Sequence, residues 1–145
     1  MRKRWSEVLM PIEDTDTIRK ILQEARTIAV VGASEKPWRD SNSIARFLKH
    51  KGYTVYPVNP NYREIDGEQC YPDLASIPAP IDIVDVFRQP SAVPEIVKEA
   101  VAIGAKTLWL QYGVVHEQAA AEAERAGLQV IMDRCIAVDY RQLLH

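Results

Sequence analysis

Cysteine and histidine, the side chains that most often hold structural metal ions, are scarce in this chain of 145 residues, which has two cysteines and three histidines. Cys70 and Cys135 lie far apart, and neither belongs to a Cys-x-x-Cys pair or to a histidine-rich segment. This usage argues against a zinc site and against a fold held together by disulfides. We therefore predict no metal site.

An excess of positive charge is also missing, because 18 Lys and Arg residues are balanced by 20 Asp and Glu residues, for a formal net charge of -2. Nucleic-acid binding is therefore disfavoured. No apolar run approaches the roughly 20 residues that span a membrane, and no apolar segment follows the basic residues Met1–Arg4, as it would in a secretory signal. We expect a cytoplasmic protein that binds neither nucleic acid nor membrane.

Two glycine-rich nucleotide signatures are absent as well. The apolar run Thr27–Val31 is followed by Gly32-Ala33-Ser34-Glu35-Lys36-Pro37, which keeps only the first glycine of a GxGxxG dinucleotide fingerprint. The run at 53–58 ends in Val58-Asn59-Pro60, without the acidic residue that binds ribose hydroxyls in that fingerprint. A P-loop, GxxxxGK followed by Ser or Thr, occurs nowhere. These absences disfavour NAD(P) and exclude a P-loop nucleotide site.

Apolar periodicity is what the chain does have, and it predicts alternating helices and strands. Apolar residues three and four apart predict a helix capped within Asp14–Thr17, and Asn42 or Ser43 is predicted to cap a second helix that stops at Lys51-Gly52. Further helices are predicted at 93–104 and 116–125, with one helical turn after Pro72. Short β-branched runs predict strands at Thr27–Val31, Tyr53–Val58, Gln69–Tyr71, Ile81–Phe87, Lys106–Leu110 and Leu128–Met132.

This alternation predicts an α/β fold in three layers, a Rossmann-like, doubly wound parallel sheet of five or six strands in the order 3-2-1-4-5(-6). The short run Gln69–Tyr71 is taken as strand 3. One domain is expected over residues 14–145, preceded by an arm over residues 1–13 whose Trp5, Val8, Leu9 and Met10 are available to pack on the domain or on a second subunit.

Ligands of such sheets bind where the winding direction reverses, outside the carboxyl ends of the strands. The predicted order brings four loops together there, at residues 32–42, 58–61, 87–90 and 111–113. They include small residues that let a ligand come close to the backbone, a hydroxyl, three cations, an aromatic ring and an Asn-Pro turn. Together these features suit a ligand with several phosphates. These features belong to Gly32, Ala33, Ser34, Lys36, Arg39, Arg88, Phe87, Asn59 and Pro60.

Five motifs in the same order resemble those of the small stand-alone CoA-binding proteins, a family similar to the CoA-binding domain of the succinyl-CoA synthetase α subunit. They are Val31-Gly32-Ala33-Ser34, Gly52-Tyr53-Thr54-Val55-Tyr56-Pro57-Val58-Asn59-Pro60, Val86-Phe87-Arg88, Leu108-Trp109-Leu110-Gln111-Tyr112-Gly113-Val114 and Met132-Asp133-Arg134-Cys135. The resemblance implies coenzyme A as cofactor and places its nucleotide part at Gly32, Ala33, Ser34, Lys36, Asn59, Pro60, Phe87 and Arg88, with Arg39 and Gln111 as further contacts.

No catalytic constellation is evident, because His50, His116 and His145 have no carboxylate partner at a suggestive spacing. We expect a non-catalytic module that binds CoA or acyl-CoA, with an unidentified protein partner or as a homo-oligomer. Two alternatives stay open. One is an NAD(P)-binding domain of an enzyme or regulator, and the other is a thiol redox protein that forms a mixed disulfide with CoA at Cys135.

Overall fold

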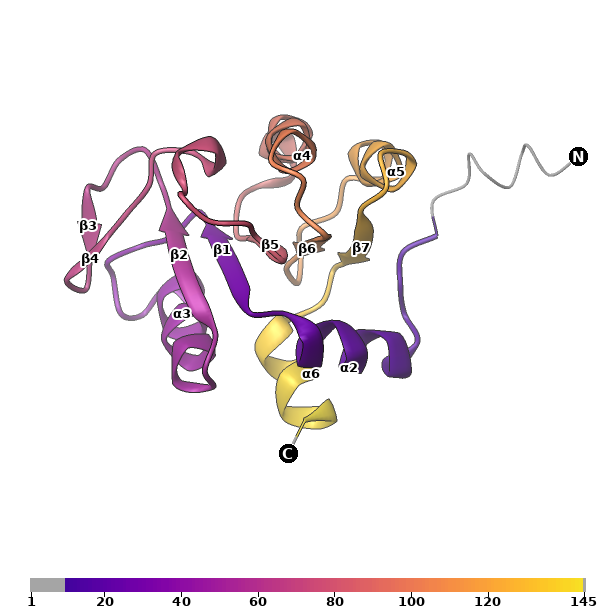
Figure 1. The fold of residues 1–145 in the computed structure, drawn as a ribbon, viewed down its shortest axis with the longest axis horizontal. Coiled ribbons are helices and arrows are strands. Elements are labelled where there is room, and N and C mark those ends of the chain that lie inside the picture. The colour runs from indigo at the N-terminus through magenta and orange to yellow at the C-terminus, as the bar shows by residue number, and fades with distance from the viewer. Residues whose placement is uncertain (1–9, 145) are drawn as a thin grey trace, which may run out of the picture.

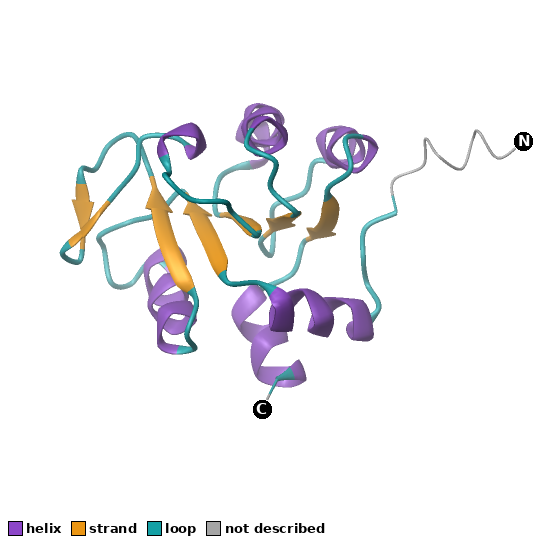
Figure 2. Cartoon of the chain, in the orientation of Figure 1, coloured by secondary structure: helices purple, strands orange, loops and turns teal. Residues whose placement is uncertain are grey.

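The computed structural model describes residues 10–144, in which five parallel strands form one sheet between two layers of helices (Figures 1 and 2). The spatial order is β2-β1-β5-β6-β7, so the winding direction reverses between β1 and β5. The predicted three-layer, Rossmann-like parallel fold is thereby confirmed. The strands are β1 (Thr27–Val31), β2 (Thr54–Val58), β5 (Ile83–Val86), β6 (Thr107–Leu110) and β7 (Gln129–Met132).

The helices divide between the two faces of the sheet (Figure 1). One face is covered by α4 (Val93–Ala102), α5 (Glu117–Arg125) and the 3-10 turn η1 (Leu74–Ser76), and a second 3-10 turn, η2 (Pro90–Ala92), leads into α4. The other face is covered by α2 (Thr15–Glu24), α3 (Asp40–His50) and α6 (Ile136–Leu143).

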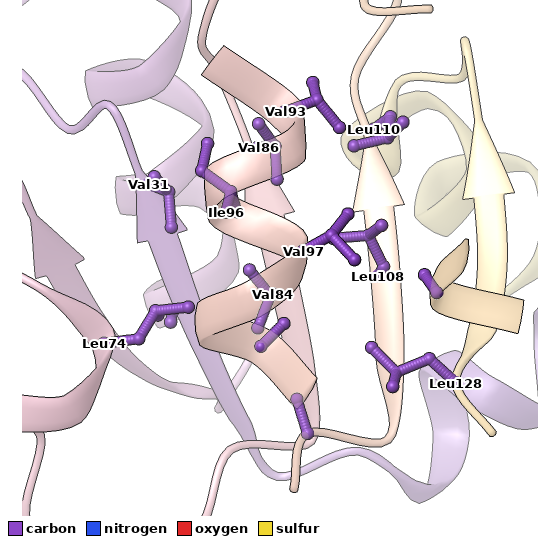
Figure 3. Packing of buried hydrophobic residues seen from close by; sticks show 14 of the residues in the cluster. Val31, Leu74, Val84, Val86, Val93, Ile96, Val97, Leu108, Leu110 and Leu128 are labelled. Carbon is purple, nitrogen blue, oxygen red and sulfur yellow. The ribbon is translucent and has the colours of Figure 1, made fainter. Parts of the chain in front are cut away.

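The central strands are buried on both sides, which explains their uninterrupted apolar runs. On the α4 face, Val84 and Val86 of β5 pack beside Leu108 and Leu110 of β6, and α4 covers them (Figure 3). The sequence does not predict α6, whose Ile136 is fully buried on the opposite face.

The start of α3 differs from the prediction that Asn42 or Ser43 caps it. The helix begins at Asp40, Arg39 takes the cap position without a side-chain cap bond, and Asn42 lies inside the first turn. The physical reason is that the Asn42 amide is drawn away from the helix N–H groups toward the carbonyl of Ser34 and the carboxylate of Asp66. The cap of α2 is as predicted, since Asp14 lies within the expected capping segment and accepts from the Thr17 N–H at 2.9 Å.

The short strand predicted at Gln69–Tyr71 is reduced to one isolated parallel bridge between Val58 and Tyr71. The residues before Tyr71 instead form an antiparallel hairpin of β3 (Glu64–Ile65) and β4 (Glu68–Gln69). Asp66 and Gly67 connect the two strands with φ of 50° and 81°, as a two-residue hairpin turn of type I′ requires. An Asp-Gly turn therefore overrides extension of the parallel sheet.

Of the predicted N-terminal arm, Trp5, Val8 and Leu9 lie outside the described residues. Met10 is exposed, and its N–H donates to Glu124 Oε1 at 3.0 Å. The Ile12 N–H donates to the carbonyl of Val130 at 2.8 Å, so the segment runs along the outer edge of β7.

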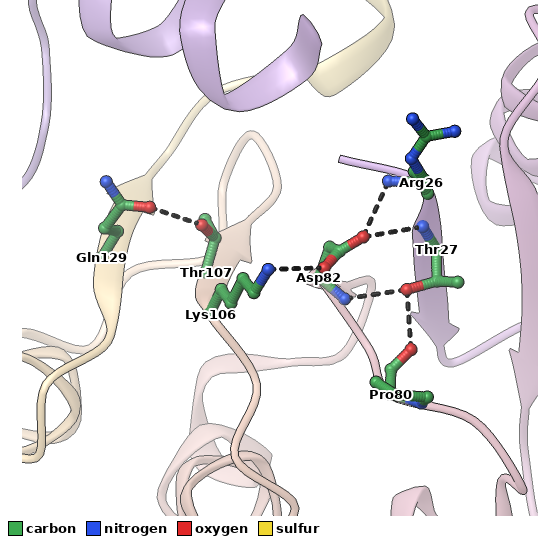
Figure 4. A network of polar contacts seen from close by, with 7 residues as sticks. All are labelled: Arg26, Thr27, Pro80, Asp82, Lys106, Thr107 and Gln129. Carbon is green, nitrogen blue, oxygen red and sulfur yellow. Dashed lines mark hydrogen bonds and ion pairs between the residues drawn. The ribbon is translucent and has the colours of Figure 1, made fainter. Parts of the chain in front are cut away.

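At the amino edge of the sheet, Asp82 organises a polar network (Figure 4). Its carboxylate accepts from the N–H groups of Arg26 and Thr27 at 2.7 and 3.1 Å and lies 3.4 Å from Lys106 Nζ. Burial raises the pKa of Asp82, but these donors outweigh it and the pKa is lowered. The network ties the beginnings of β1, β5 and β6 together and is a structural feature of this edge.

Candidate functional site

A cleft of about 1040 Å³ opens at the carboxyl edge of the sheet. The four loops that the sequence places at the switch point all contribute to its wall, together with the loop after β7 and the exposed sides of α3 and α6. Of the predicted site residues, all but Pro60 line the cleft. The ones that do are Gly32, Ala33, Ser34, Lys36, Arg39, Asn59, Phe87, Arg88 and Gln111.

Gly32 marks the closest approach between the ends of β1 and β5. Its φ is +91°, and a Cβ atom placed on it would lie 2.5 Å from the carbonyl oxygen of Phe87 and 3.0 Å from Cδ of Arg88. The N–H groups of Gly32 and Ala33 both donate to the carbonyl of Val58, at 3.0 and 3.2 Å. These two amides therefore brace β2 against β1, and anionic groups in the cleft depend on other donors.

Asn59 braces the same region with its side chain. Its Nδ2 donates to the carbonyl of Ala33 at 2.8 Å, and its Oδ1 accepts from the N–H of Asn61 at 2.9 Å. The turn predicted at Asn59-Pro60 thus holds the first loop in place. Tyr62, two residues beyond Pro60, lines the cleft from the same segment.

Three cations line the cleft without a protein partner. Within residues 10–144, the side chains of Lys36, Arg39 and Arg88 form no hydrogen bond and no ion pair, and all three residues are exposed. They project from the loops after β1 and β5, the two strands that flank the switch point. The carboxyl edge therefore carries unneutralised positive charge where a doubly wound sheet binds its ligands.

At the other end of the cleft, the positive charge of an arginine is neutralised by an ion pair. Arg134 there is paired with the buried Asp139, which accepts from Nε and Nη2 at 2.8 Å each. The hydrogen bond that the guanidinium donates to Asp139 raises the pKa of Arg134, against the opposing effect of burial. Around this pair the wall includes Tyr112, Val114 and Val138, and also the acidic Asp133. The cleft thus carries three unpaired cations toward β1 and β5, whereas toward β6 and β7 the charge of Arg134 is neutralised by Asp139.

Gln111 helps to fix the position of α6 at the end of the cleft near β6 and β7. The residue is buried, and its Oε1 accepts from the N–H of Ile136 at 3.1 Å, one of the N–H groups that a helix start leaves without an intrahelical partner. Asp133, held at φ +61°, accepts from the N–H of Gly113 at 2.7 Å and joins the loops after β6 and β7.

Sequence reasoning missed the contribution of α6, Asp133 and Arg134, and it placed Cys135 at the ligand only in the redox alternative. Asp133, Arg134 and Cys135 line the cleft, and Cys135 is half-buried at the start of α6. These residues belong to the fifth family-like motif, so their place at a strand end was the available signal. Tyr112 was not named as a contact, although it lies in the predicted site loop 111–113 and is 79% exposed.

Within residues 10–144, no group of three or more His, Cys, Asp or Glu residues is placed to hold a metal ion. His116 accepts from the N–H of Ala119 through Nδ1 at 3.1 Å and caps α5. No helix of the described part of the chain is long and apolar enough to cross a membrane.

Comparison with known families gives one clear match, in which the model of the CoA binding domain matches residues 26–141. The uncharacterised protein YneT of Bacillus subtilis is 40% identical over 83% of this chain and 90% of its own length. ADP-forming acetate–CoA ligase I of Archaeoglobus fulgidus is 29% identical over 78% of this chain, but the match covers only 18% of the ligase.

Solved structures agree with this match. A hypothetical protein from Pyrococcus horikoshii OT3 is 41% identical and superposes with a TM-score of 0.90 over 94% of this chain and 97% of its own. The dinucleotide-forming acetyl-coenzyme A synthetase 1 of Ca. Korarchaeum cryptofilum, in its apo form, gives a TM-score of 0.67 at 26% identity over 74% of this chain and 26% of the synthetase.

Proposed function

Because the chain belongs to the family of CoA-binding domains, we propose that it binds coenzyme A or an acyl-CoA in the cleft, as a binding module rather than as an enzyme. The observation that carries the proposal is the set of three unpartnered cations, Lys36, Arg39 and Arg88, around a cleft at the switch point. Charge-assisted hydrogen bonds to phosphate are roughly twice as strong as neutral ones, so these side chains suit a ligand with several phosphates.

The asymmetry of the cleft supports the same ligand. Coenzyme A carries its phosphates at the nucleotide end and an uncharged chain ending in a thiol or thioester at the other. The nucleotide end fits the wall formed by the loops after β1 and β5, where the charge of Arg88 is not neutralised. The uncharged chain fits the wall near Tyr112 and Val138, where Asp139 already neutralises Arg134.

The same features disfavour a dinucleotide. The end of β2 offers Asn59 in place of an acidic residue, and both polar groups of its amide are engaged with Ala33 and Asn61. A ribose hydroxyl pair would therefore lack its usual carboxylate acceptor at this position. Neither His50 nor His116 lines the cleft.

Isothermal titration calorimetry with CoA and with NAD at equal salt tests the proposal. We expect saturable binding of CoA and much weaker or no binding of NAD. Arg88→Ala should weaken CoA binding by about 1 to 3 kcal/mol because it removes one charge-assisted contact to phosphate.

Arg125→Ala is the matched control, because Arg125 is exposed on α5, in the opposite layer of the fold, and should leave the affinity unchanged. Preference for NAD, or no heat with either ligand, would overturn the proposed function. An unchanged affinity in Arg88→Ala would remove that side chain from the site.

A further inference from the structure

We propose that Asn42 is a positioning residue that closes the first loop of the cleft, and that the hairpin β3–β4 sets its orientation through Asp66. Asn42 and Asp66 would thereby hold Lys36 and Arg39 in place. The inference rests on the proposed function only in taking CoA as the ligand. Neither Asn42 nor Asp66 lines the cleft.

The segment from Ser34 to Asn42 is a closed circuit of hydrogen bonds. The N–H of Lys36 donates to Ser34 Oγ at 3.1 Å, the N–H of Arg39 donates to the Lys36 carbonyl at 3.0 Å, and the N–H of Asn42 donates to the Arg39 carbonyl at 3.0 Å. Asn42 Nδ2 then returns to the carbonyl of Ser34 at 2.8 Å. This last bond joins the two ends of the segment that carries two of the three unpartnered cations.

The orientation of the Asn42 amide is specified from both sides. Its Nδ2 faces Asp66 Oδ2 at 3.1 Å, which only accepts, and its Oδ1 accepts from Nε of Arg46 at 2.8 Å, which only donates. Asn42 is 3% exposed, so each of these bonds replaces one to water. An amide fits this position, whereas a carboxylate would face the Ser34 carbonyl and the Asp66 carboxylate with acceptors alone.

The hairpin brings Asp66 to this place independently of the cleft. The two-residue turn at Asp66 and Gly67 presents the carboxylate toward α3, and Ile65 is buried in the core on the α3 face. A second anchor, the ion pair of Lys49 and Glu68 at 2.7 Å, holds the hairpin to α3 without touching Asn42. That pair supplies a matched control, because Lys49→Ala removes a contact between the hairpin and α3 that does not involve the Asn42 amide.

A mutant cycle tests the positioning role. We expect Asn42→Ala to weaken CoA binding by about tenfold. A tenfold loss corresponds to roughly one hydrogen bond, which is what the loop loses when the Asn42 amide no longer orders it. In a background that carries both Lys36→Ala and Arg39→Ala the same change should cost about twofold or less, because its effect passes through the two cations that the loop carries. Lys49→Ala should leave the affinity within about twofold of the unchanged protein. Equal losses in both backgrounds would overturn the inference.

Hydrogen exchange without ligand separates this inference from the proposed function. We expect the amides of Lys36 and Arg39, which are hydrogen-bonded within the loop, to exchange about tenfold faster in Asn42→Ala and in Asp66→Ala, and at an unchanged rate in Lys49→Ala. If CoA does not bind but the loop loses protection as stated, the proposed function fails and the positioning role stands. If the loop keeps its protection in Asn42→Ala, the positioning role fails whatever the ligand.

Discussion

Gly32 is the residue at which the backbone of the cleft is most tightly constrained. Its positive φ is shared with Gly104, but only Gly32 has the Phe87 carbonyl 2.5 Å from the site of a Cβ atom, whereas nothing lies within 4 Å at Gly104. Both conformations are costly for other residues, by about 1–3 kcal/mol. A comparison of alanine substitutions at the two glycines therefore separates the cost of backbone strain from the cost of the contact with Phe87.

We predict that Gly32→Ala lowers the free energy of unfolding by clearly more than Gly104→Ala, because alanine at 32 must also push apart the ends of β1 and β5. Urea unfolding of the two variants measures the difference, and ligand titration shows whether the cleft is distorted. Equal destabilisation by the two substitutions would mean that the contact with Phe87 is easily relieved.

Asp85 is a buried carboxyl group without a protein partner. It lies on β5 in register between Val30 and Trp109, it is fully buried, and neither oxygen has a hydrogen-bond partner within the described residues. Burial raises the pKa of Asp85 well above its ordinary value. The folded state therefore binds this proton more tightly than the unfolded state does.

Stability gained from that proton is fully present below the unfolded pKa of about 4 and is lost as the pH rises through the raised pKa of the folded state. Asn cannot ionise, so we predict that the melting temperature of Asp85→Asn, relative to the unchanged protein, increases steadily from pH 4 upward. Thermal unfolding of both proteins at a series of pH values measures this gap. A gap that stays constant with pH would show that Asp85 ionises without cost.

At the level of single residues, the sequence predicted well which residues line the cleft and less well which groups they bind. Lys36, Arg39 and Arg88 were predicted because cations after buried strands fall at the ligand edge, and they do line the cleft. The N–H groups of Gly32 and Ala33 are committed to Val58. That commitment depends on how closely β1 and β2 approach, which no residue pattern reveals.

Among the elements, α6 has a partly buried ion pair at its first turn. Arg134 precedes the helix and Asp139 lies inside it, with side chains 31% and 5% exposed. We predict that Asp139→Ala lowers the free energy of unfolding by about 1.5–3 kcal/mol, because it removes charge-assisted bonds and leaves a partly buried guanidinium without its partner.

Asp16→Ala is the comparison for that change, since it breaks the exposed pair of Asp16 and Arg19 on α2. Such surface pairs contribute about 0–1 kcal/mol. Chemical denaturation of both variants gives the two values. A loss in Asp139→Ala no larger than in Asp16→Ala would show that the pair does not hold α6.

Elements with strong local signals were predicted well, and those set by distant contacts were not. The alternating apolar stripes of α2 and α4 and the β-branched run of β1 are local, and each element lies where expected. The hairpin β3–β4 carried a usable signal in Asp66-Gly67 after Ile65, which a search for two-residue turns would have found. The start of α3 has no such signal, because it depends on Asp66 reaching Asn42.

For the whole molecule, the sheet order follows from rules that need no knowledge of side-chain contacts. Strands that alternate with helices pair in parallel, and right-handed crossovers reduce the possible orders to a few. The doubly wound order among them has its switch point between β1 and β5, as observed. The third strand of that arrangement is reduced to the bridge at Tyr71, so the sheet has five strands. The position of the cleft was therefore predictable from topology. The neutralisation of Arg134 was not, because it depends on Asp139 of α6, a helix that the sequence analysis does not include.

The central claim is that coenzyme A occupies the cleft at the carboxyl edge of the sheet. Backbone-amide NMR spectra recorded during titration with CoA test it most directly. The account predicts shifts concentrated in residues 32–39, 87–88 and 111–113. Shifts confined to the opposite edge, around the cavity of about 320 Å³ beside Asp82 and Lys106, or no shifts at saturating CoA, would contradict it.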